Sequence, residues 1–327
     1  MTDQAAALSL PTPLRRLADI ISRNGLWVTL AVIVAAFSFL APNFMTLSNI
    51  MNVLLQSSNI GIMAAGLTLV VICGEIDLSV ASLQSLGACI VAILVINMGV
   101  PIPIAMVAAI LAGGLAGLVS GTIVGTFAVP AFIITLAMDS FGRGIALIIT
   151  NQNSVFGFPQ SFSVFGQGYL GPVPVAALIA GFVFFVLHIV LSRTVLGTNI
   201  YAVGGNREAA RLAGINIFAV KVAVLTISGL CGTTAGVLMA SRLMAAQPIM
   251  GMFDLMDVIA AVVIGGASLL GGEGRMLGTI LGTLIITFIR NGLNLMGIPA
   301  DWQLIAIGII IVIAVLTDFS SRRANAG

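Results

Sequence analysis

The residues best suited to catalysis or metal binding are scarce in this sequence. It contains one lysine, Lys221, and one histidine, His188. A phosphate-binding loop needs a Gly-Lys-Ser/Thr run, in which backbone amides and the lysine hold the phosphates, whereas Lys221 is flanked by valines. The three cysteines, Cys73, Cys89 and Cys231, match no metal site in number or spacing and are interpreted as small core residues. The sequence therefore predicts no nucleotide site, no metal and no cofactor in this chain.

One enzymatic alternative is an intramembrane serine protease, in which His188 would activate a serine such as Ser268. Ser268 lies in the run GGASLLGG, whose paired glycines fit a break in the backbone equally well. A single histidine is more typical of a core or interfacial residue than of a catalyst. We therefore expect no catalytic residue. The glycines expected to mark a helix break here are Gly265, Gly266, Gly271 and Gly272.

Carboxylates within apolar segments are costly and usually have a role. Asp139 and Arg143 are four residues apart, so they can neutralise each other on one helix face. Asp254 and Asp257 precede an apolar segment, and we expect them to cap the amides at its start. As a proton relay, such carboxylates would instead indicate a secondary transporter.

A second helix break is expected around two further carboxylates, Glu75 and Asp77. At such a break a carboxylate can accept hydrogen bonds from the amides that begin the next helix. The residues of this motif are Gly74, Asp77 and Ser79, and capping is favoured over solute binding for its acids.

Four amide side chains recur at helical spacing in one apolar segment: Asn49, Asn52, Gln56 and Asn59. The steps of three, four and three residues place them along one face of a helix. Amides that faced lipid would have no hydrogen-bond partners, so this face points to the protein interior or to a watery cavity. Two interpretations follow. Asn52, Gln56 and Asn59 line a path for a neutral, hydroxyl-rich solute, or the amides join helices to one another.

The composition of the whole chain decides where these residues can lie. Of 327 residues, 59% are hydrophobic and 7% are charged, whereas a soluble domain has about 25% charged residues. Mean hydropathy is +1.18. Too little polar surface is available to cover a soluble globule, which excludes soluble enzymes, nucleic-acid binders and disordered scaffolds. The net charge of +2 is too small to indicate a polyanionic partner.

Three uncharged stretches, 24–74, 78–138 and 144–192, are each longer than the about 20 apolar residues that one membrane crossing needs. Their apolar runs are continuous rather than alternating, which argues against a β-barrel. We predict an all-α membrane protein with about ten transmembrane helices. The expected segments are roughly 26–40, 50–72, 80–97, 103–125, 131–149, 173–191, 218–240, 257–270, 276–296 and 302–317.

An even number of crossings places both termini on one side, and most basic residues gather on that side, which makes it cytoplasmic. The expected organisation is a cytoplasmic segment at 1–25, a transmembrane domain at 26–317 and a cytoplasmic tail at 318–327. The charge-free loop 150–172 is expected to be periplasmic, and the charged loop 192–217 cytoplasmic. The first apolar run imitates a signal peptide but is interpreted as a retained anchor, and the eighth segment is short enough to be re-entrant.

Glycines recur every fourth residue in the fourth and ninth segments: Gly113, Gly117, Gly121 and Gly125, then Gly274, Gly278 and Gly282. This spacing lets another helix approach closely. The two segments are the fourth members of two five-helix halves, and an odd number of helices per half gives an inverted repeat. The alternative is that such glycine spacing is common in any membrane bundle.

Five motifs, in order, resemble the permease subunits of ribose-type ABC importers, the monosaccharide branch. GEIDLSVAS (Gly74–Ser82) is similar to that family's GGIDLSVGS, and VPAFIITLAM followed by Arg143-Gly144 is similar to its P-F-I-V-T-L…R-G segment. The other three are AVGGNREAARLAGI (Ala202–Ile215), DVIAAVVIGGASLLGGEGRMLGT (Asp257–Thr279) and NGLNLMGI (Asn291–Ile298). The departures are Glu75 and Ala81 in place of glycines, Asp139 in place of an uncharged residue and Ala213 in place of serine.

The resemblance implies the ten-helix fold shared with vitamin B12-type (type II) importers, in a bacterial inner membrane. It also implies a pore made with a second, identical or different permease chain, a cytoplasmic ABC ATPase on another polypeptide, and a periplasmic sugar-binding protein. Membrane lipid would surround the chain, and no nucleic acid is involved. The coupling helix that contacts the ATPase would be formed or flanked by Asn206, Arg207, Glu208, Ala209, Ala210, Arg211 and Gly214.

The favoured function is therefore the pore subunit of an ATP-driven importer of a monosaccharide or a similar small polar solute. The alternative is a self-sufficient secondary transporter coupled to protons or sodium. An importer permease should be inactive alone in liposomes, whereas a secondary transporter should not. Which sugar, polyol, nucleoside or autoinducer is carried is left open by these motifs.

Overall fold

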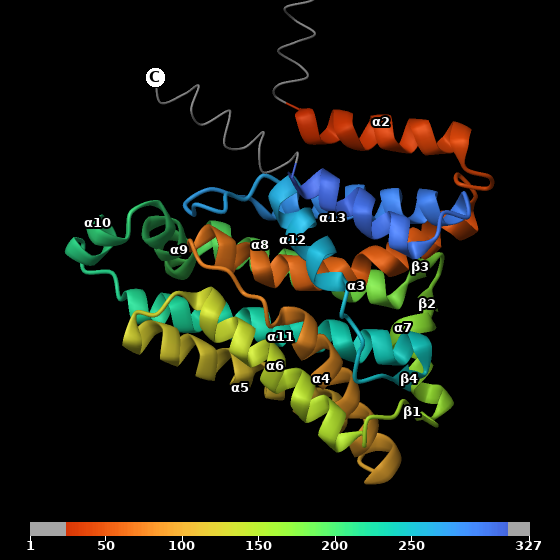
Figure 1. Ribbon diagram of the computed structural model, residues 1–327, viewed down its shortest axis with the longest axis horizontal. Helices are drawn as coiled ribbons and strands as arrows, with labels where there is room; N and C mark the ends of the chain where they lie inside the picture. The colour runs from red at the N-terminus through yellow and green to blue at the C-terminus, as the bar shows by residue number, and fades with distance from the viewer. Residues whose placement is uncertain (1–23, 313–327) are drawn as a thin grey trace, which may run out of the picture.

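The structure, a computed structural model, describes residues 24–312 and is predominantly helical (Figure 1). The expected N-terminal segment 1–25 and tail 318–327 lie outside the described residues, except for residues 24 and 25. In chain order the helices are α2 (Gly25–Leu40), α3 (Leu47–Ile72), α4 (Val80–Ala92), the π-helix η1 (Ile93–Asn97), α5 (Ile102–Phe127), α6 (Ala131–Ile149), the 3-10 helix η2 (Gln160–Phe162), α7 (Ser163–Gln167), α8 (Val175–Arg193), α9 (Val195–Gly205), α10 (Arg207–Leu212), α11 (Ile217–Leu243), α12 (Asp254–Ile264), α13 (Met276–Leu295) and a last helix at Ala300–Val312.

A helix lies at each of the ten predicted positions, and seven of those described are long and apolar enough to cross a membrane: α3, α4 with η1, α5, α6, α8, α11 and α13. The first helix, α2, and the last, Ala300–Val312, are apolar but shorter. The prediction for the eighth segment, 257–270, was wrong in extent. Helix α12 has only 11 residues and ends at Ile264, because Gly265 and the left-handed Gly266 (φ +83°) close its last turn.

Helix α11 lies at the centre of one half of the molecule, where it packs on α3, α4 and α5 (Figure 1). The predicted glycine face of α5 makes this contact. A Cβ added at Gly117 would lie 2.2 Å from the carbonyl oxygen of Leu225, and one at Gly113 would lie 2.3 Å from that of Gly229. Only glycine permits this approach, so the close-packing function predicted for the spacing is confirmed.

The second glycine row acts in the same way between α13 and α12. A Cβ at Gly278 would lie 1.9 Å from the carbonyl oxygen of Gly265, and one at Gly282 would lie 2.0 Å from that of Ala261. Gly274, which was expected in the same row, precedes the helix and adopts φ +151° in the loop.

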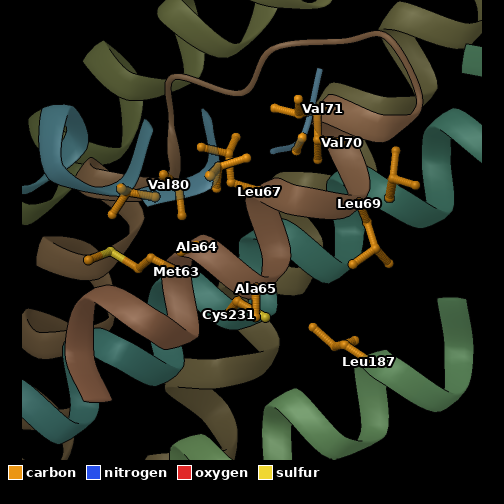
Figure 2. Close-up of a cluster of buried hydrophobic side chains, with 14 of the residues drawn as sticks. Met63, Ala64, Ala65, Leu67, Leu69, Val70, Val71, Val80, Leu187 and Cys231 are labelled. Atoms are coloured by element: carbon orange, nitrogen blue, oxygen red, sulfur yellow. The ribbon is translucent and has the colours of Figure 1, made fainter. Parts of the chain in front are cut away.

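The main apolar core is built around the second half of α3, which is apolar on all sides and therefore has to be covered all round. Figure 2 shows Ala65 of α3 beside Cys231 of α11, with Leu187 of α8 on the side of Leu69. The three cysteines are buried and unbridged, as the sequence predicted.

The loops expected on opposite sides of the membrane lie at opposite ends of the helices (Figure 1). Helices α9 and α10, from loop 192–217, form one end. At the other end, loop 150–172 folds into β1 (Val155–Phe156), η2, α7 and β2 (Tyr169–Leu170). Strand β1 pairs antiparallel with β4 (Ala245–Ala246), and β2 pairs antiparallel with β3 (Val173–Pro174).

A labelling experiment tests this polarity. Ser154 and Asn206 are exposed at the two ends, so cysteines introduced there should react with an impermeant thiol reagent from opposite faces of the membrane. The unmodified chain is a suitable control, since its own cysteines are buried and should react slowly. Labelling of both positions from the same face would contradict the arrangement.

Candidate functional site

The loop after α3 places an acid at the start of α4. Asp77 is 1% exposed. Its Oδ1 accepts hydrogen bonds from the backbone N–H and the hydroxyl of Ser79, at 2.8 and 2.6 Å, and its Oδ2 accepts one from the hydroxyl of Ser228 on α11, at 2.6 Å. Asp77 therefore holds the start of α4 against the middle of α11.

Glu75 differs from its expected role. It does not cap α4; instead its Oε2 accepts a hydrogen bond from the backbone N–H of Ala131, the first residue of α6, at 3.3 Å. Its Oε1 lies 2.6 Å from Nη2 of Arg207 and 2.7 Å from Nζ of Lys221. Glu75 and Lys221 are 7% and 3% exposed. A buried lysine requires such an anionic partner, since an unpaired charge there would be prohibitively costly.

Loop 265–275 returns to the same end of the molecule. Gly266, Gly271 and Gly272 all have positive φ angles, between +77° and +85°, so the chain turns sharply without a side chain in the way. The backbone N–H of Gly272 donates to the carbonyl oxygen of Ile72, the last residue of α3, at 2.8 Å. The two predicted helix breaks, at Gly74 and at Gly265–Gly266, therefore lead into loops that bond to each other.

The third motif, in α9, fits between these loops. A Cβ at Gly204 would lie 1.8 Å from the carbonyl oxygen of Ile72 and 2.6 Å from the nitrogen of Gly272, and one at Gly271 would lie 2.8 Å from Cα of Gly74. We call this meeting of Gly74, Gly204, Gly271 and Gly272 the glycine junction. Its role was not predicted for Gly204, although the Gly-Gly pair before Asn206 was a signal for close backbone contact.

The predicted coupling residues form a short exposed helix, α10, directly after α9. Asn206 caps it, since its Oδ1 accepts from the N–H of Ala209 at 2.9 Å. Gly214, at φ +80°, ends it with a turn in which the N–H of Ile215 donates to the carbonyl oxygen of Ala210 at 3.0 Å. Glu208 and Arg211 pair on its outer face, with two thirds of each side chain exposed, and Ala210 is buried against the bundle.

The four amide side chains at helical spacing on α3, Asn49, Asn52, Gln56 and Asn59, have different surroundings. Asn49 and Asn291 exchange two hydrogen bonds, at 2.8 and 2.9 Å, which join α3 to α13. Asn59 is buried, and its Nδ2 lies 3.5 Å from Oδ2 of Asp254. Asn52 is exposed and accepts a 3.3 Å hydrogen bond from Arg242, while Gln56 is half-buried. Asn49 therefore hydrogen-bonds one helix to another, whereas Asn52 is exposed and Gln56 is partly exposed.

The expected capping by Asp254 and Asp257 was wrong. Neither side chain caps α12, although both lie in its first turn. Asp254 accepts from Nε2 of Gln84 at 3.1 Å, and Asp257 forms an ion pair with Arg290 of α13 at 2.7 Å. Both carboxylates find charged or amide donors on neighbouring helices, which stabilises them more than the half-charge of a helix end.

Of the two other residue pairs considered from the sequence, one is in contact and one is not. Asp139 and Arg143 lie 3.7 Å apart on α6, as their spacing predicted. Among the described residues, no hydrogen bond joins Ser268 to His188, the hypothetical protease pair. The hydroxyl of Ser268 accepts from the N–H of Leu270 at 3.2 Å, and the backbone carbonyl of His188 accepts from Ser192 at 2.6 Å.

Substitution of one glycine at the junction should separate the backbone segments that meet there. Gly204→Ala places a methyl group 1.8 Å from the carbonyl oxygen of Ile72, far closer than a non-bonded contact allows, so we expect it to lower the free energy of unfolding by about 1–3 kcal/mol or more. Gly205→Ala is the matched control, because its Cβ would meet no atom within 4 Å. Thermal unfolding in detergent measures both, and equal melting temperatures for the two variants would contradict the close contact.

The chain matches the family described as the permease component of the branched-chain amino acid transport system over residues 49–315. It is 42% identical to the ribose import permease protein RbsC of Escherichia coli (strain K12), over 89% of this chain and 92% of that protein. It is 40% identical to the ribose import permease protein RbsC of Bacillus subtilis (strain 168), over 91% and 93% of the two chains. The D-allose transport system permease protein AlsC of Escherichia coli (strain K12) is 37% identical, over 90% and 91%. No solved structure matches. Because both the family and these relatives cover nearly the whole chain, the protein belongs to this family of bacterial membrane transport permeases.

Proposed function

We propose that the chain is the membrane-spanning subunit of an ATP-driven, binding-protein-dependent importer of a monosaccharide or a similar small polar solute. The observation that carries this is the match to import permeases named for ribose and D-allose, which extends over about nine tenths of each chain. The solute itself is inferred from these names alone. ATP hydrolysis belongs to a separate ATPase polypeptide, and the chain lies in the bacterial inner membrane with both termini in the cytoplasm.

The direct test is reconstitution. The chain in liposomes with its cognate ATPase and binding protein should take up ribose or a related sugar only when ATP is supplied. The chain alone should show no uptake driven by a proton or sodium gradient. Gradient-driven uptake by the chain alone would favour the secondary transporter instead.

The proposed fold has ten crossings, arranged as two inverted five-helix halves of the vitamin B12-importer type. The positions at which α4 and α12 begin support it. Helix α4 begins beside the middle of α11, since the carbonyl oxygen of Val80 would lie 2.8 Å from a Cβ on Gly232 and Asp77 accepts a hydrogen bond from Ser228. Helix α12 likewise begins beside the middle of α3, where Asp254 contacts Asn59. Helices α4 and α12 are the third members of their halves, and their entry loops come from opposite ends.

The proposed pore requires a second permease chain, and α6 supports this. Its Asp139–Arg143 pair is 22–25% exposed within a helix able to cross the membrane. Charged side chains that face lipid are costly, whereas they are tolerated against another protein or a watery cavity. We therefore infer that this face of α6 lies at the interface or pore between the two chains, not toward the acyl chains.

The ATPase is proposed to bind at α10. Its exposed face presents Leu212, which is 77% exposed, next to the charged pair Glu208 and Arg211. An apolar tip with charged sides fits a groove in a partner. Tyr201 and Gly204 then connect this helix to the bundle, because Tyr201 donates a 2.7 Å hydrogen bond to the carbonyl oxygen of Gly274.

Charge reversal on α10 should release the ATPase. We expect Glu208→Lys to weaken co-purification of the ATPase about tenfold or more, because like charges at a docking surface repel, while the amount of permease in the membrane stays unchanged. Gly214→Trp should also disrupt α10, because it adds a bulky side chain at the turn that ends the helix, where residue 214 has a left-handed backbone conformation. A conservative control is Glu208→Asp, and wild-type ATPase binding by both disruptive variants would refute the assignment.

The solute path is proposed to pass Asn52 and Gln56, with Asn59 at its inner limit. Uncharged amides can exchange brief hydrogen bonds with a sugar without trapping it. We expect Gln56→Leu to reduce uptake several-fold while complex assembly remains normal, whereas Gln56→Asn should retain most uptake. Accessibility of a cysteine at position 56 should change between ATP-free and vanadate-trapped complexes. Normal uptake by Gln56→Leu, with an inert cysteine in both states, would place the path elsewhere.

A further inference from the structure

We propose that Glu75, together with Lys221 and Arg207, forms a positioning link that transmits movement of α10 to the starts of α4 and α6. We call these three residues the Glu75 link. This inference rests on the proposed function, because it specifies how the ATPase-binding helix acts on the pore.

The geometry of the Glu75 link joins four segments at one carboxylate. Glu75 belongs to loop 73–79, and its Oε1 is shared by Arg207 at the start of α10 and Lys221 in the first turns of α11, at 2.6 and 2.7 Å. Its Oε2 accepts from the N–H of Ala131 at the start of α6, at 3.3 Å. One buried side chain thereby contacts the coupling helix and two helices able to cross the membrane.

The two cations have different exposure, which suggests different roles. The side chain of Lys221 is 4% exposed, whereas that of Arg207 is 49% exposed. The lysine fixes the position of the carboxylate within the bundle through its 2.7 Å contact, since a buried charge needs an opposite charge nearby. The arginine is the arm that extends from this fixed point into α10, where the ATPase is proposed to bind.

Movement of α10 has a short route from Glu75 to the rest of the chain. Two residues after Glu75, Asp77 bonds to Ser79 at the start of α4 and to Ser228 of α11. Glu75 itself bonds to the start of α6, the helix whose Asp139–Arg143 face is proposed to meet the second permease chain. Movement of Arg207 would therefore be transmitted to the start of α6 through Glu75, and to the start of α4 through the backbone that joins Glu75 to Asp77.

Among the described residues, the ion pair that leaves α10 ends on Glu75 of loop 73–79. Glu208 and Arg211 pair with each other within α10, whereas Arg207 is the member of this helix that forms an ion pair beyond it. A purely structural salt bridge would stabilise the fold without affecting how ATP hydrolysis is used. The Glu75 link predicts an effect on coupling that can be separated from stability.

The experiment uses the complete complex in liposomes, with ribose as the probe, and measures solute imported per ATP hydrolysed together with thermal unfolding. Arg207→Gln should leave the melting temperature nearly unchanged, because the residue is half exposed, but should lower solute per ATP at least about fivefold, the low end of usual coupling effects. Lys221→Met should do the opposite: it should lower the melting temperature and retain most of the solute-per-ATP ratio, since Glu75 still meets Arg207.

The double variant Glu75→Gln with Lys221→Met removes both buried charges together, which avoids an unpaired charge in the core. It should fold and show the same loss of coupling as Arg207→Gln, and adding Arg207→Gln to it should cause no further loss. Arg193→Gln, an exposed arginine at the same end of the molecule, is the control for general loss of positive charge and should behave like the wild type.

A wild-type solute-per-ATP ratio in Arg207→Gln would overturn the link, whether or not the double variant folds. The same holds if Arg207→Gln lowers the ratio further in the double variant, because the arginine would then act through another partner. If the wild-type complex itself hydrolyses ATP but imports no sugar, the proposed function fails and the link fails with it. That result is distinguishable, since it appears before any substitution is made.

Discussion

A polar group inside a lipid bilayer has no water to bond to, and this constraint explains most of the polar architecture of the chain. Where the backbone leaves a helix, its amides and carbonyls find partners in another loop, as Gly272 does with Ile72. Where a charge enters the bundle, an opposite charge or several hydroxyls meet it, as at Glu75 with Lys221 and at Asp77 with Ser79 and Ser228. Two of these contacts, at Glu75 and Asp77, lie where the chain leaves α3 and before α4 begins.

Close helix contact is the second requirement, and glycine provides it. Between α5 and α11, and between α12 and α13, carbonyl oxygens of one helix occupy the space where a side chain of the other would be. Lipid tails are as apolar as leucine, so apolar side chains alone give little drive for helices to associate in a membrane. Close backbone approach increases van der Waals contact between the helices instead.

Much of this could be predicted from the sequence, because periodicity and uncharged length report on local structure. The helix positions, the glycine face of α5 and the Asp139–Arg143 pair follow from spacing alone. Contacts between residues that are far apart in the sequence cannot be predicted from spacing. Glu75 was expected to cap the next helix, but its partners are Ala131, Arg207 and Lys221, which lie far from it in the sequence. The isolated Lys221 was the available signal, since a lysine among valines needs a carboxylate somewhere in the fold.

The errors at Asp254 and Asp257 have the same origin. Capping is a local interaction of an exposed or partly exposed helix end, whereas both acids lie against other membrane helices that offer Gln84 and Arg290. A buried carboxylate gains more from a charged or amide donor than from a helix end. The few polar residues of such an apolar chain therefore often mark contacts between helices. A single spacing pattern can nevertheless contain residues that join helices and residues that stay exposed. Asn49 joins α3 to α13, whereas Asn52, one turn later, remains exposed. An amide stripe on a membrane helix thus narrows the search for a solute path, and the burial of each amide decides which members are free to line it.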